Sequence, residues 1–154
     1  MFHYQNGCQN RTAIWRTNLY GGNYMKRVYI LLNHKPTERQ LEDLAFFAGE
    51  EIEVVEPKQE VKDIWADISP EFDEYCRYNI AKFILKDILE KNIDFVWVQG
   101  ENVTVYHLVE LLKKKEIVAI AATTKRKTTE EQLDDGTTKK TSIFEHCRFV
   151  LYWF

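Results

Sequence analysis

The sequence predicts an α/β fold in which a mainly parallel sheet is flanked by helices. Two observations carry this prediction. Short, continuous apolar runs, typical of strands covered on both faces, occur at residues 28–32, 95–98 and 117–122. Segments with helical spacing of apolar residues alternate with the strands through short connections, which implies parallel strands and right-handed crossovers. The Rossmann-like class fits this order of elements.

The segments that follow the first strand carry capping and breaking signals. Thr37 and Gln40 have the spacing of a capping box, and Gly49 ends the helical periodicity that follows them. A second short strand is expected at residues 52–55. A short helix that carries a tryptophan is expected at residues 58–68.

Two longer helices are expected in the middle of the chain. Ser69 and Pro70 have the character of the cap and first turn of a helix. The buried stripe of that helix is expected at Phe72, Cys76, Ile80, Phe83 and Ile84. The next helix runs through residues 105–112 and ends in three lysines, which suit its C-terminal dipole.

The end of the chain breaks the alternation of strands and helices. Residues 128–133 and 137–152 have the pattern of a C-terminal β-hairpin around a turn at 134–136. Strand alternation places three residues on one apolar face of the last strand, namely Cys147, Phe149 and Leu151. His146 and Arg148 are expected on the other face, roughly 7 Å apart along the strand.

Length and composition indicate one domain with a substantial core. The chain has 154 residues, of which 45% are hydrophobic and 14% aromatic. Its formal net charge of −3 argues against a DNA-coating protein, so no DNA partner is expected. Residues 1–24 lack core periodicity and Met25 resembles an ordinary start, so we expect an extension at 1–24 and one domain at 25–154. The alternative for residues 1–24 is a short arm packed on the domain.

Several kinds of site and location are disfavoured by the sequence. Three cysteines at spacings that fit no disulfide framework indicate free thiols in a reducing compartment. No apolar run is long enough for a membrane span and no signal peptide is evident, so a cytoplasmic protein without a membrane partner is expected. Phosphate-loop, dinucleotide, nucleophile-elbow and metal-ligand patterns are missing, so we expect neither a metal nor a cofactor.

Polar residues follow three of the predicted strands. They are Asn33 and His34 after the first, Gln99, Gly100, Glu101 and Asn102 after the third, and Thr123, Thr124, Lys125 and Arg126 after the fourth. Ligands of open α/β sheets bind beyond the carboxyl ends of the parallel strands, where these residues would meet. Gly100 permits close backbone approach, and a helix that begins near Asn102 offers free N–H groups. The sequence therefore predicts a phosphate-binding rim.

Structural alternatives exist for the members of this set. Asn33 and His34 precede a proline and also suit a turn. Glu101 suits the positive end of a helix dipole. His146 is equally compatible with a strand histidine satisfied by its neighbours. The cations at residues 125–127 also suit an edge strand that resists aggregation.

Four stretches of the chain resemble the small CRISPR-associated Csx-type proteins of type III systems, in the family numbered twenty. The stretches are YILLNHKPTERQLEDL, VWVQG, TTKR and EQLDDGTTKKTSIFEHCRF. Their order and spacing carry the resemblance, which covers about residues 26–152. Residues 1–24 lie outside it.

The resemblance implies a CARF-like Rossmann domain that acts as a stand-alone ring nuclease in antiviral defence. Such proteins bind cyclic oligoadenylate, usually cyclic tetra-adenylate, and linearise it without a metal to switch off type III signalling. They generally act as two-fold symmetric homodimers. The matching positions in this chain are Asn33, His34, Gln99, Gly100, Thr123, Thr124, Lys125, Arg126, His146 and Arg148.

Roles for these residues follow from the chemistry of RNA cleavage. The ribose 2′-hydroxyl is the nucleophile, so the protein must align it and stabilise negative charge on the phosphate. Candidates for charge stabilisation are Lys125, Arg126 and Arg148. Candidates for positioning are Thr123 and Thr124, and candidates for proton transfer are His34 and His146.

Two other functions stay open from the sequence. One is a sensor that binds cyclic oligoadenylate at the same pocket without cleaving it. The other is an interaction module whose aromatic surface, including Trp153 and Phe154, binds a protein partner.

Overall fold

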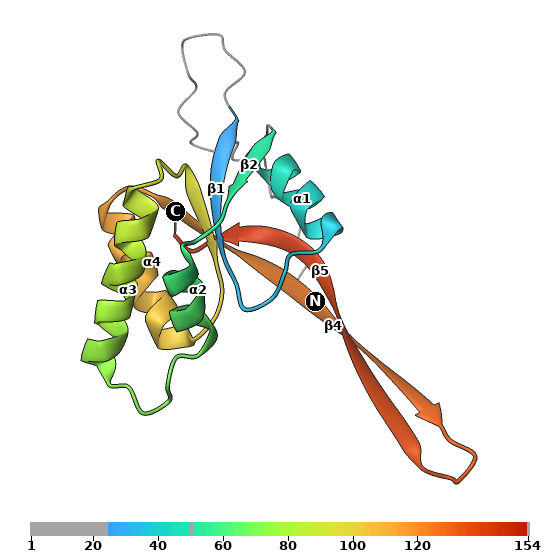
Figure 1. The fold of residues 1–154 in the computed structure, drawn as a ribbon. Coiled ribbons are helices and arrows are strands. Elements are labelled where there is room, and N and C mark those ends of the chain that lie inside the picture. Colours follow the sequence, from blue (N-terminus) through green and yellow to red (C-terminus); the bar gives the residue numbers. More distant parts are fainter. Residues whose placement is uncertain (1–24, 50, 154) are drawn as a thin grey trace, which may run out of the picture.

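Five strands form a single sheet in the order β2-β1-β3-β4-β5. The parallel members are β1 (Lys26–Leu31), β2 (Ile52–Val55), β3 (Phe95–Val98) and the first part of β4 (Val118–Gln132). β5 (Thr138–Leu151) runs antiparallel to β4. The structure is therefore a mixed α/β fold with a mostly parallel sheet flanked by helices, as the sequence predicted (Figure 1).

The structure is a computed structural model that describes residues 25–49 and 51–153. The extension expected at residues 1–24 lies outside the described residues, as does Phe154 of the expected aromatic surface. Its neighbour Trp153 is half-buried and packs against the core of the domain, so this indole is not a free surface for a partner.

Helices cover both faces of the sheet. α1 (Glu38–Ala48) packs on one face, and α2 (Gln59–Ala66), α3 (Glu74–Leu89) and α4 (Asn102–Lys114) pack on the other (Figure 1). Each face has its own apolar core because successive strand residues point to opposite sides. Thus Val28 and Trp97 belong to the core beneath α1, whereas their neighbours Tyr29 and Val98 belong to the core beneath the other three helices.

Capping side chains set where the helices begin. The capping box of Thr37 and Gln40 is present at α1, and Gly49 ends that helix with a φ of 71°. The prediction that Ser69 and Pro70 open the long helix is wrong. Asp73 caps α3 instead, by accepting a hydrogen bond of 2.8 Å from the Cys76 N–H, while the Ser69 hydroxyl accepts from the N–H of Glu71 in a preceding turn.

The buried stripe of α3 also differs from the prediction. Phe72, Cys76 and Phe83 are exposed, and the buried side chains are instead Ala81, Ile84, Leu85, Asp87 and Ile88. The prediction began the helix at Ser69 and Pro70, whereas α3 begins at Glu74, and it therefore assigned exposed side chains to the buried face. Only Ile84, which is buried, and Ile80, which is partly buried, were placed correctly.

β4 and β5 continue past the body of the protein as a long two-stranded arm, which we define as residues 123–148 (Figure 1). The sequence predicted that the strand stops at residue 122, but β4 runs without a break to Gln132. Threonines at 123, 124, 128 and 129 favour extended backbone, which explains the continuation. A turn with Gly136 at a φ of 84° joins the two strands.

Candidate functional site

The carboxyl ends of β1 and β3 lie at one edge of the sheet, as predicted, beside Ala122 of β4, but β4 itself does not end there and continues to Gln132. The Gln99 N–H donates to the Leu31 carbonyl at 3.2 Å, which joins the ends of β1 and β3. From β1 the chain first adds β2 on one side of β1 and then crosses to the other side, where β3 and the later strands lie. The order of strands therefore reverses between β1 and β3. Ligands of open α/β sheets bind at such reversals. We call the residues at this edge the rim: Asn33, His34, Gln99, Gly100, Glu101, Asn102, Thr123 and Thr124.

The side chain of Gln99 is hydrogen-bonded to the neighbouring strand of the sheet. Its side-chain Nε2 donates to the Ala122 carbonyl at 3.1 Å, and its Oε1 accepts from the Ala122 N–H at 3.0 Å. The same oxygen accepts from the Trp97 indole at 2.7 Å. The amide thus extends the pairing of β3 with β4 by one step. The expectation that this side chain contacts a ligand does not fit these bonds.

Position 100 needs a glycine because the Trp65 indole lies directly against its backbone. A Cβ atom at this position would lie 2.6 Å from Cζ2 of Trp65, well inside contact distance. The Trp65 indole also donates to the Gln99 carbonyl at 3.3 Å, so it is fixed against this turn. Close approach of the backbone was predicted for Gly100, but its neighbour is the buried indole of α2.

Glu101 caps the N-terminus of α4, where the sequence predicted a bound ligand. Its carboxylate accepts from the N–H groups of Val103 and Thr104 at 3.1 and 2.9 Å, and from the Thr104 hydroxyl at 2.6 Å. Arg77 of α3 pairs with it at 2.8 Å. Burial opposes ionisation, but these bonds outweigh it and lower the pKa of Glu101 to about 2. The helix-dipole alternative for Glu101 is therefore the observed one.

Thr124 of the rim is exposed on β4. Three further rim residues, Asn33, His34 and Asn102, are also exposed and free to meet a ligand. The His34 Nδ1 lies 3.1 Å from the adjacent Lys35 carbonyl, and its ring is otherwise open to solvent. These side chains flank the point where the strand order reverses, between the ends of β1 and β3.

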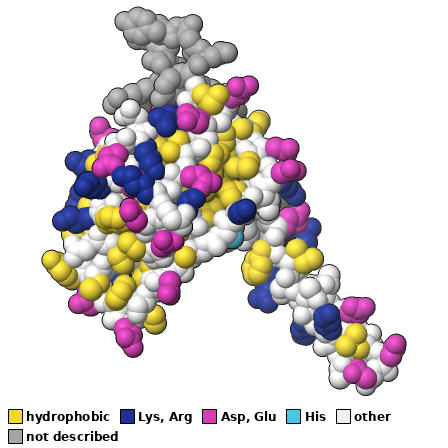
Figure 2. All heavy atoms as spheres, viewed as in Figure 1, with side chains coloured by type: hydrophobic (Ala, Val, Ile, Leu, Met, Phe, Trp, Pro, Cys, Tyr) yellow, Lys and Arg dark blue, Asp and Glu magenta, His cyan; other side chains and the backbone are white. Residues whose placement is uncertain are grey.

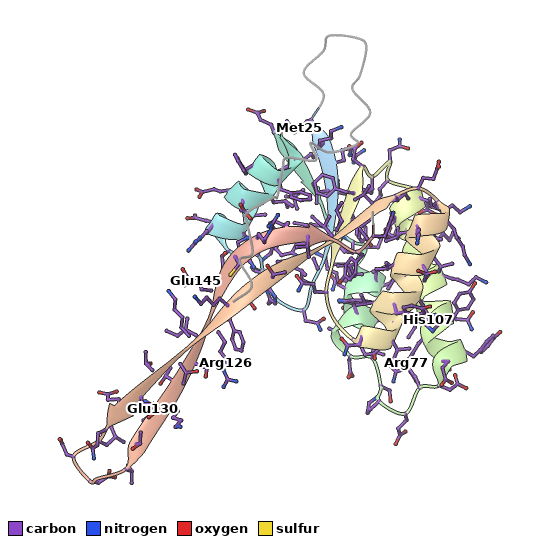
Figure 3. All side chains as sticks on the ribbon, turned by 180° about the vertical axis from the view of Figure 1, so that it is seen from behind. Met25, Arg77, His107, Arg126, Glu130 and Glu145 are labelled. Carbon is purple, nitrogen blue, oxygen red and sulfur yellow. The ribbon has the colours of Figure 1, made fainter. Side chains whose placement is uncertain are left out.

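The three cations at residues 125–127 lie on the arm and not at a turn. Each residue of β4 advances about 3.3 Å, so Arg126 lies roughly 13 Å beyond Ala122. Arg126 donates through Nε and Nη2 to the Ser142 hydroxyl at 3.0 and 2.9 Å, and Figure 3 shows it on the arm, away from Arg77. Lys127 is ion-paired with Glu145, which also pairs with Arg39 of α1 at 3.3 Å.

Lys125 and Arg148 lie at the base of the arm without such partners. Both are exposed, and no carboxylate among the described residues lies within ion-pairing distance of either one. Thr123 hydrogen-bonds across the strands to the Arg148 carbonyl at 3.1 Å, which fixes the backbone there. Two cations that form no ion pair among the described residues therefore adjoin the rim, although Glu145, already paired with Arg39 and Lys127, lies opposite Lys125 in the register.

A bulge in β5 places His146 on a different face from the one predicted. Thr123 pairs with Arg148 and Thr124 with His146, so Cys147 has no partner on β4. His146 is thereby buried beside Phe149, with ring centroids 5.0 Å apart, whereas Cys147 and Arg148 are exposed. The expectations that His146 points with Arg148 and that Cys147 faces the apolar side are both wrong.

Sequence reasoning missed the partner of His146. Its Nε2 lies 2.7 Å from Oδ2 of Asp43 on α1, and its Nδ1 is buried without a hydrogen bond among the described residues. Asp43 and Asp87 gave no signal because both lie inside helical patterns. Trp65 and Arg77 became significant only through contacts with residues 99–101. Glu101 caps α4 although glutamate is not among the usual N-cap residues, so this cap left no local signal in the sequence.

Neither a metal-binding cluster nor a membrane-spanning helix is present in residues 25–49 and 51–153. No cluster of three or more histidines, cysteines or carboxylates in this part of the chain could hold a metal ion. Within the same residues, none of the helices combines the length and apolar character needed to cross a bilayer.

Comparison with known proteins gives one match. Residues 26–150 match the family described as "Uncharacterized protein MJ1673 family". None of the curated proteins matches the chain, and none of the solved structures does.

Proposed function

This chain belongs to the MJ1673 family, and we propose that it is a CARF-like, Rossmann-type ring nuclease that binds cyclic oligoadenylate at the rim and linearises it. Cyclic tetra-adenylate is the proposed substrate, and termination of type III CRISPR signalling in the cytoplasm is the proposed role. The proposal rests on the Csx-type resemblance of the four stretches and on the chemistry of the rim. It is independent of the family match.

The observation that supports the proposal best is the pairing of a strand-order reversal with cations that form no ion pair among the described residues. Asn33 and His34 flank the reversal between β1 and β3. Lys125 on β4 and Arg148 on β5 stand at the base of the arm, exposed and in no ion pair among the described residues, with Glu145 opposite Lys125 in the strand register. Amide, imidazole and cationic groups on one edge suit a ligand with several phosphates and ribose hydroxyls.

The proposed reaction needs no group beyond those of the RNA and this chain. The ribose 2′-oxygen attacks the adjacent phosphorus, and the bond from phosphorus to the 5′-oxygen breaks. The 2′-hydroxyl loses its proton and the departing 5′-oxygen gains one, which leaves a cyclic phosphate and a 5′-hydroxyl. Holding the attacking oxygen in line can lower the barrier by roughly 7–11 kcal/mol in favourable cases.

The geometry refines the roles expected from the sequence. Lys125 and Arg148 are the best placed to stabilise charge on the phosphate, because Arg126 and Lys127 already have partners on the arm. His34 is the better candidate for proton transfer because it is exposed, whereas His146 is buried against Phe149 and bonded to Asp43.

Incubation with cyclic tri-, tetra- and hexa-adenylate, followed by chromatography of the products, tests the proposal. Linear products from one ring size, formed equally with excess EDTA, are expected. Binding without products would favour the sensor. Neither binding nor products would reject the proposal and favour an interaction module. Loss of cleavage in EDTA, restored by magnesium or manganese, would reject the metal-independent mechanism.

A further inference from the structure

The outer faces of α3 and α4 carry a group of exposed aromatic side chains. Tyr75 and Tyr106 are 72% and 62% exposed, and Tyr78 is 37% exposed. The half-buried ring of His107 joins the two helices, because its centroid lies 5.6 Å from those of both Tyr78 and Tyr106. Tyr75 lies one turn before Tyr78 on the same side of α3. We call these four residues the aromatic platform.

The fold does not use the platform for packing. The side chains that hold α3 and α4 to the sheet, among them Ile84 and Leu108, lie on the opposite side of each helix. The hydroxyls of Tyr75, Tyr78 and Tyr106 form no hydrogen bond among the described residues. Contiguous exposed aromatic surface of this kind is typical of an interaction site.

Lysines follow the platform along both helices. α3 and α4 run in the same direction, because each leads into a strand of the parallel part of the sheet. One turn after Tyr78, the Lys82 ammonium lies 5.7 Å from the centre of the Tyr78 ring. Lys86 stands one turn further along α3, and Lys113 and Lys114 end α4. Figure 2 shows the same order over α3, with lysine and arginine side chains above hydrophobic ones.

This surface is positive in a chain whose formal net charge is −3. α3 and α4 carry the four exposed lysines against two carboxylates, Glu74 and Glu110, when the ion-paired Arg77 and Asp87 are not counted. None of the four lysines is in an ion pair among the described residues. A complementary partner therefore offers flat aromatic faces and negative charge side by side.

We propose that this surface binds single-stranded RNA. Its bases stack on Tyr75 and Tyr106, and its phosphates lie along the lysines. Each nucleotide of a single strand presents both a base face and a phosphate, whereas a duplex hides the base faces in its own stack. An acidic peptide would match the charge but offers few planar faces. The free tyrosine hydroxyls can bond to ribose 2′-hydroxyls, which favours RNA over DNA. The proposal does not depend on the rim.

Fluorescence anisotropy on the full chain tests the platform, with a labelled oligouridylate of about 12 nucleotides as the probe. The wild type should bind it. Tyr75→Ala/Tyr106→Ala should bind about 10²-fold more weakly, because each lost base stack costs roughly 10-fold. The matched control is Phe46→Ala/Phe144→Ala, which removes rings that are 85% and 66% exposed on α1 and on the arm. It should bind as the wild type.

Salt dependence and the sugar provide two further readouts. Lys82→Ala/Lys113→Ala/Lys114→Ala should reduce the slope of log affinity against log salt concentration by about 2, since each phosphate contact of a single strand contributes about 0.7. The alanine variant of the tyrosines should keep the wild-type slope. Tyr75→Phe/Tyr106→Phe keeps the stacking faces but loses the hydroxyls, so its affinity for the RNA should fall to that for DNA of the same length.

Four results would overturn the proposal: no binding of the RNA by the wild type at about 50 mM salt, equal loss of binding in the Phe46/Phe144 control, DNA bound as tightly as RNA, or polyglutamate bound with the same dependence on the tyrosines. The last would assign the surface to an acidic protein. Loss of binding only in Lys125→Ala/Arg148→Ala would place the RNA at the rim and also reject the platform. A protein that cleaves cyclic adenylate but does not bind linear RNA keeps the nuclease and rejects this proposal, and one that binds linear RNA without cleaving the ring does the reverse.

Discussion

The carboxylate of Glu101 lies 2.8 Å from the guanidinium of Arg77 and at the same time caps the N-terminus of α4. The pair links α3 to α4 at the rim. Glu101→Gln should lower the free energy of unfolding at pH 7 by roughly 1–2 kcal/mol, allowing for partial exposure of the carboxylate. Chemical denaturation compares it with Glu110→Gln on the same helix, which should change stability little.

The same pair predicts a pH dependence. Burial alone would raise the pKa of Glu101. The hydrogen bonds from Thr104 and Val103 and the charge of Arg77 outweigh this effect and lower the pKa from 4.5 to about 2. Its contribution is therefore complete above pH 4.5 and is lost as the pH falls from 4.5 toward 2. The difference in stability between wild type and Glu101→Gln should shrink across this window. A difference that stays constant would show that the charge of Glu101 is not the cause.

Gly100→Ala should destabilise the domain by about 1–3 kcal/mol, because the new methyl group would lie 2.6 Å from the Trp65 ring. A double-mutant cycle with Trp65→Phe measures the coupling, and the smaller ring should recover part of the loss. Gly49→Ala is the control. Nothing lies within 4 Å of a Cβ there, so its cost of about 1 kcal/mol comes from the φ of 71° and should not couple to Trp65.

The buried carboxylate of Asp87 joins three elements and should be costly to remove. It accepts from the Tyr29 hydroxyl at 2.7 Å, from the Lys58 N–H at 3.0 Å and from the Lys91 ammonium at 3.1 Å. Asp87→Ala should lower the free energy of unfolding by roughly 3–5 kcal/mol, since it leaves these donors unpaired. Tyr29→Phe should cost about 1–2 kcal/mol. Asp63→Ala, at an exposed carboxylate, should cost almost nothing, and an equal loss from all three would exclude this explanation.

Substitution of His34 should affect the rate of cleavage, whereas substitution of His146 should affect the stability of the fold. His34→Ala should lower the single-turnover rate of cyclic tetra-adenylate cleavage by about 10²-fold or more while binding is largely kept. His146→Gln should lower the melting temperature and change the rate little in the folded protein, because His146 is buried against Phe149 and Asp43. The reverse pattern would return catalysis to His146.

The sequence was most informative where a local signal decided the structure. The apolar run predicted at 28–32 lies in β1 as far as Leu31, and the run at 95–98 is β3. The Thr37 capping box and Gly49 bound α1 as predicted, because these features depend on neighbours in the chain. The start of α3 was misplaced because two capping signals, Ser69 and Asp73, competed within five residues. The second of them holds the helix.

The sequence predicted where the rim lies, but it did not predict which rim side chains bond to the protein itself. The parallel direction of the strands brings residues 33, 99 and 123 to one edge, and the alternation of strands and helices predicts that direction. Whether Gln99 and Glu101 meet a ligand or the protein depends on Ala122, Trp97 and Arg77, which are distant in the chain. The face of His146 depends on one unpaired residue, Cys147, and a register shift of this kind leaves no periodicity to detect.

Calorimetric titration with cyclic tetra-adenylate tests the rim most directly, with wild type, Lys125→Ala/Arg148→Ala and Lys127→Ala compared at the same salt concentration. We expect the wild type to bind, the double variant to bind roughly 10²-fold more weakly because two charge-assisted phosphate contacts are lost, and Lys127→Ala to bind as the wild type because Glu145 already holds that lysine. Absence of binding by the wild type, or equal affinity of all three proteins, would contradict a cyclic oligoadenylate site at this rim.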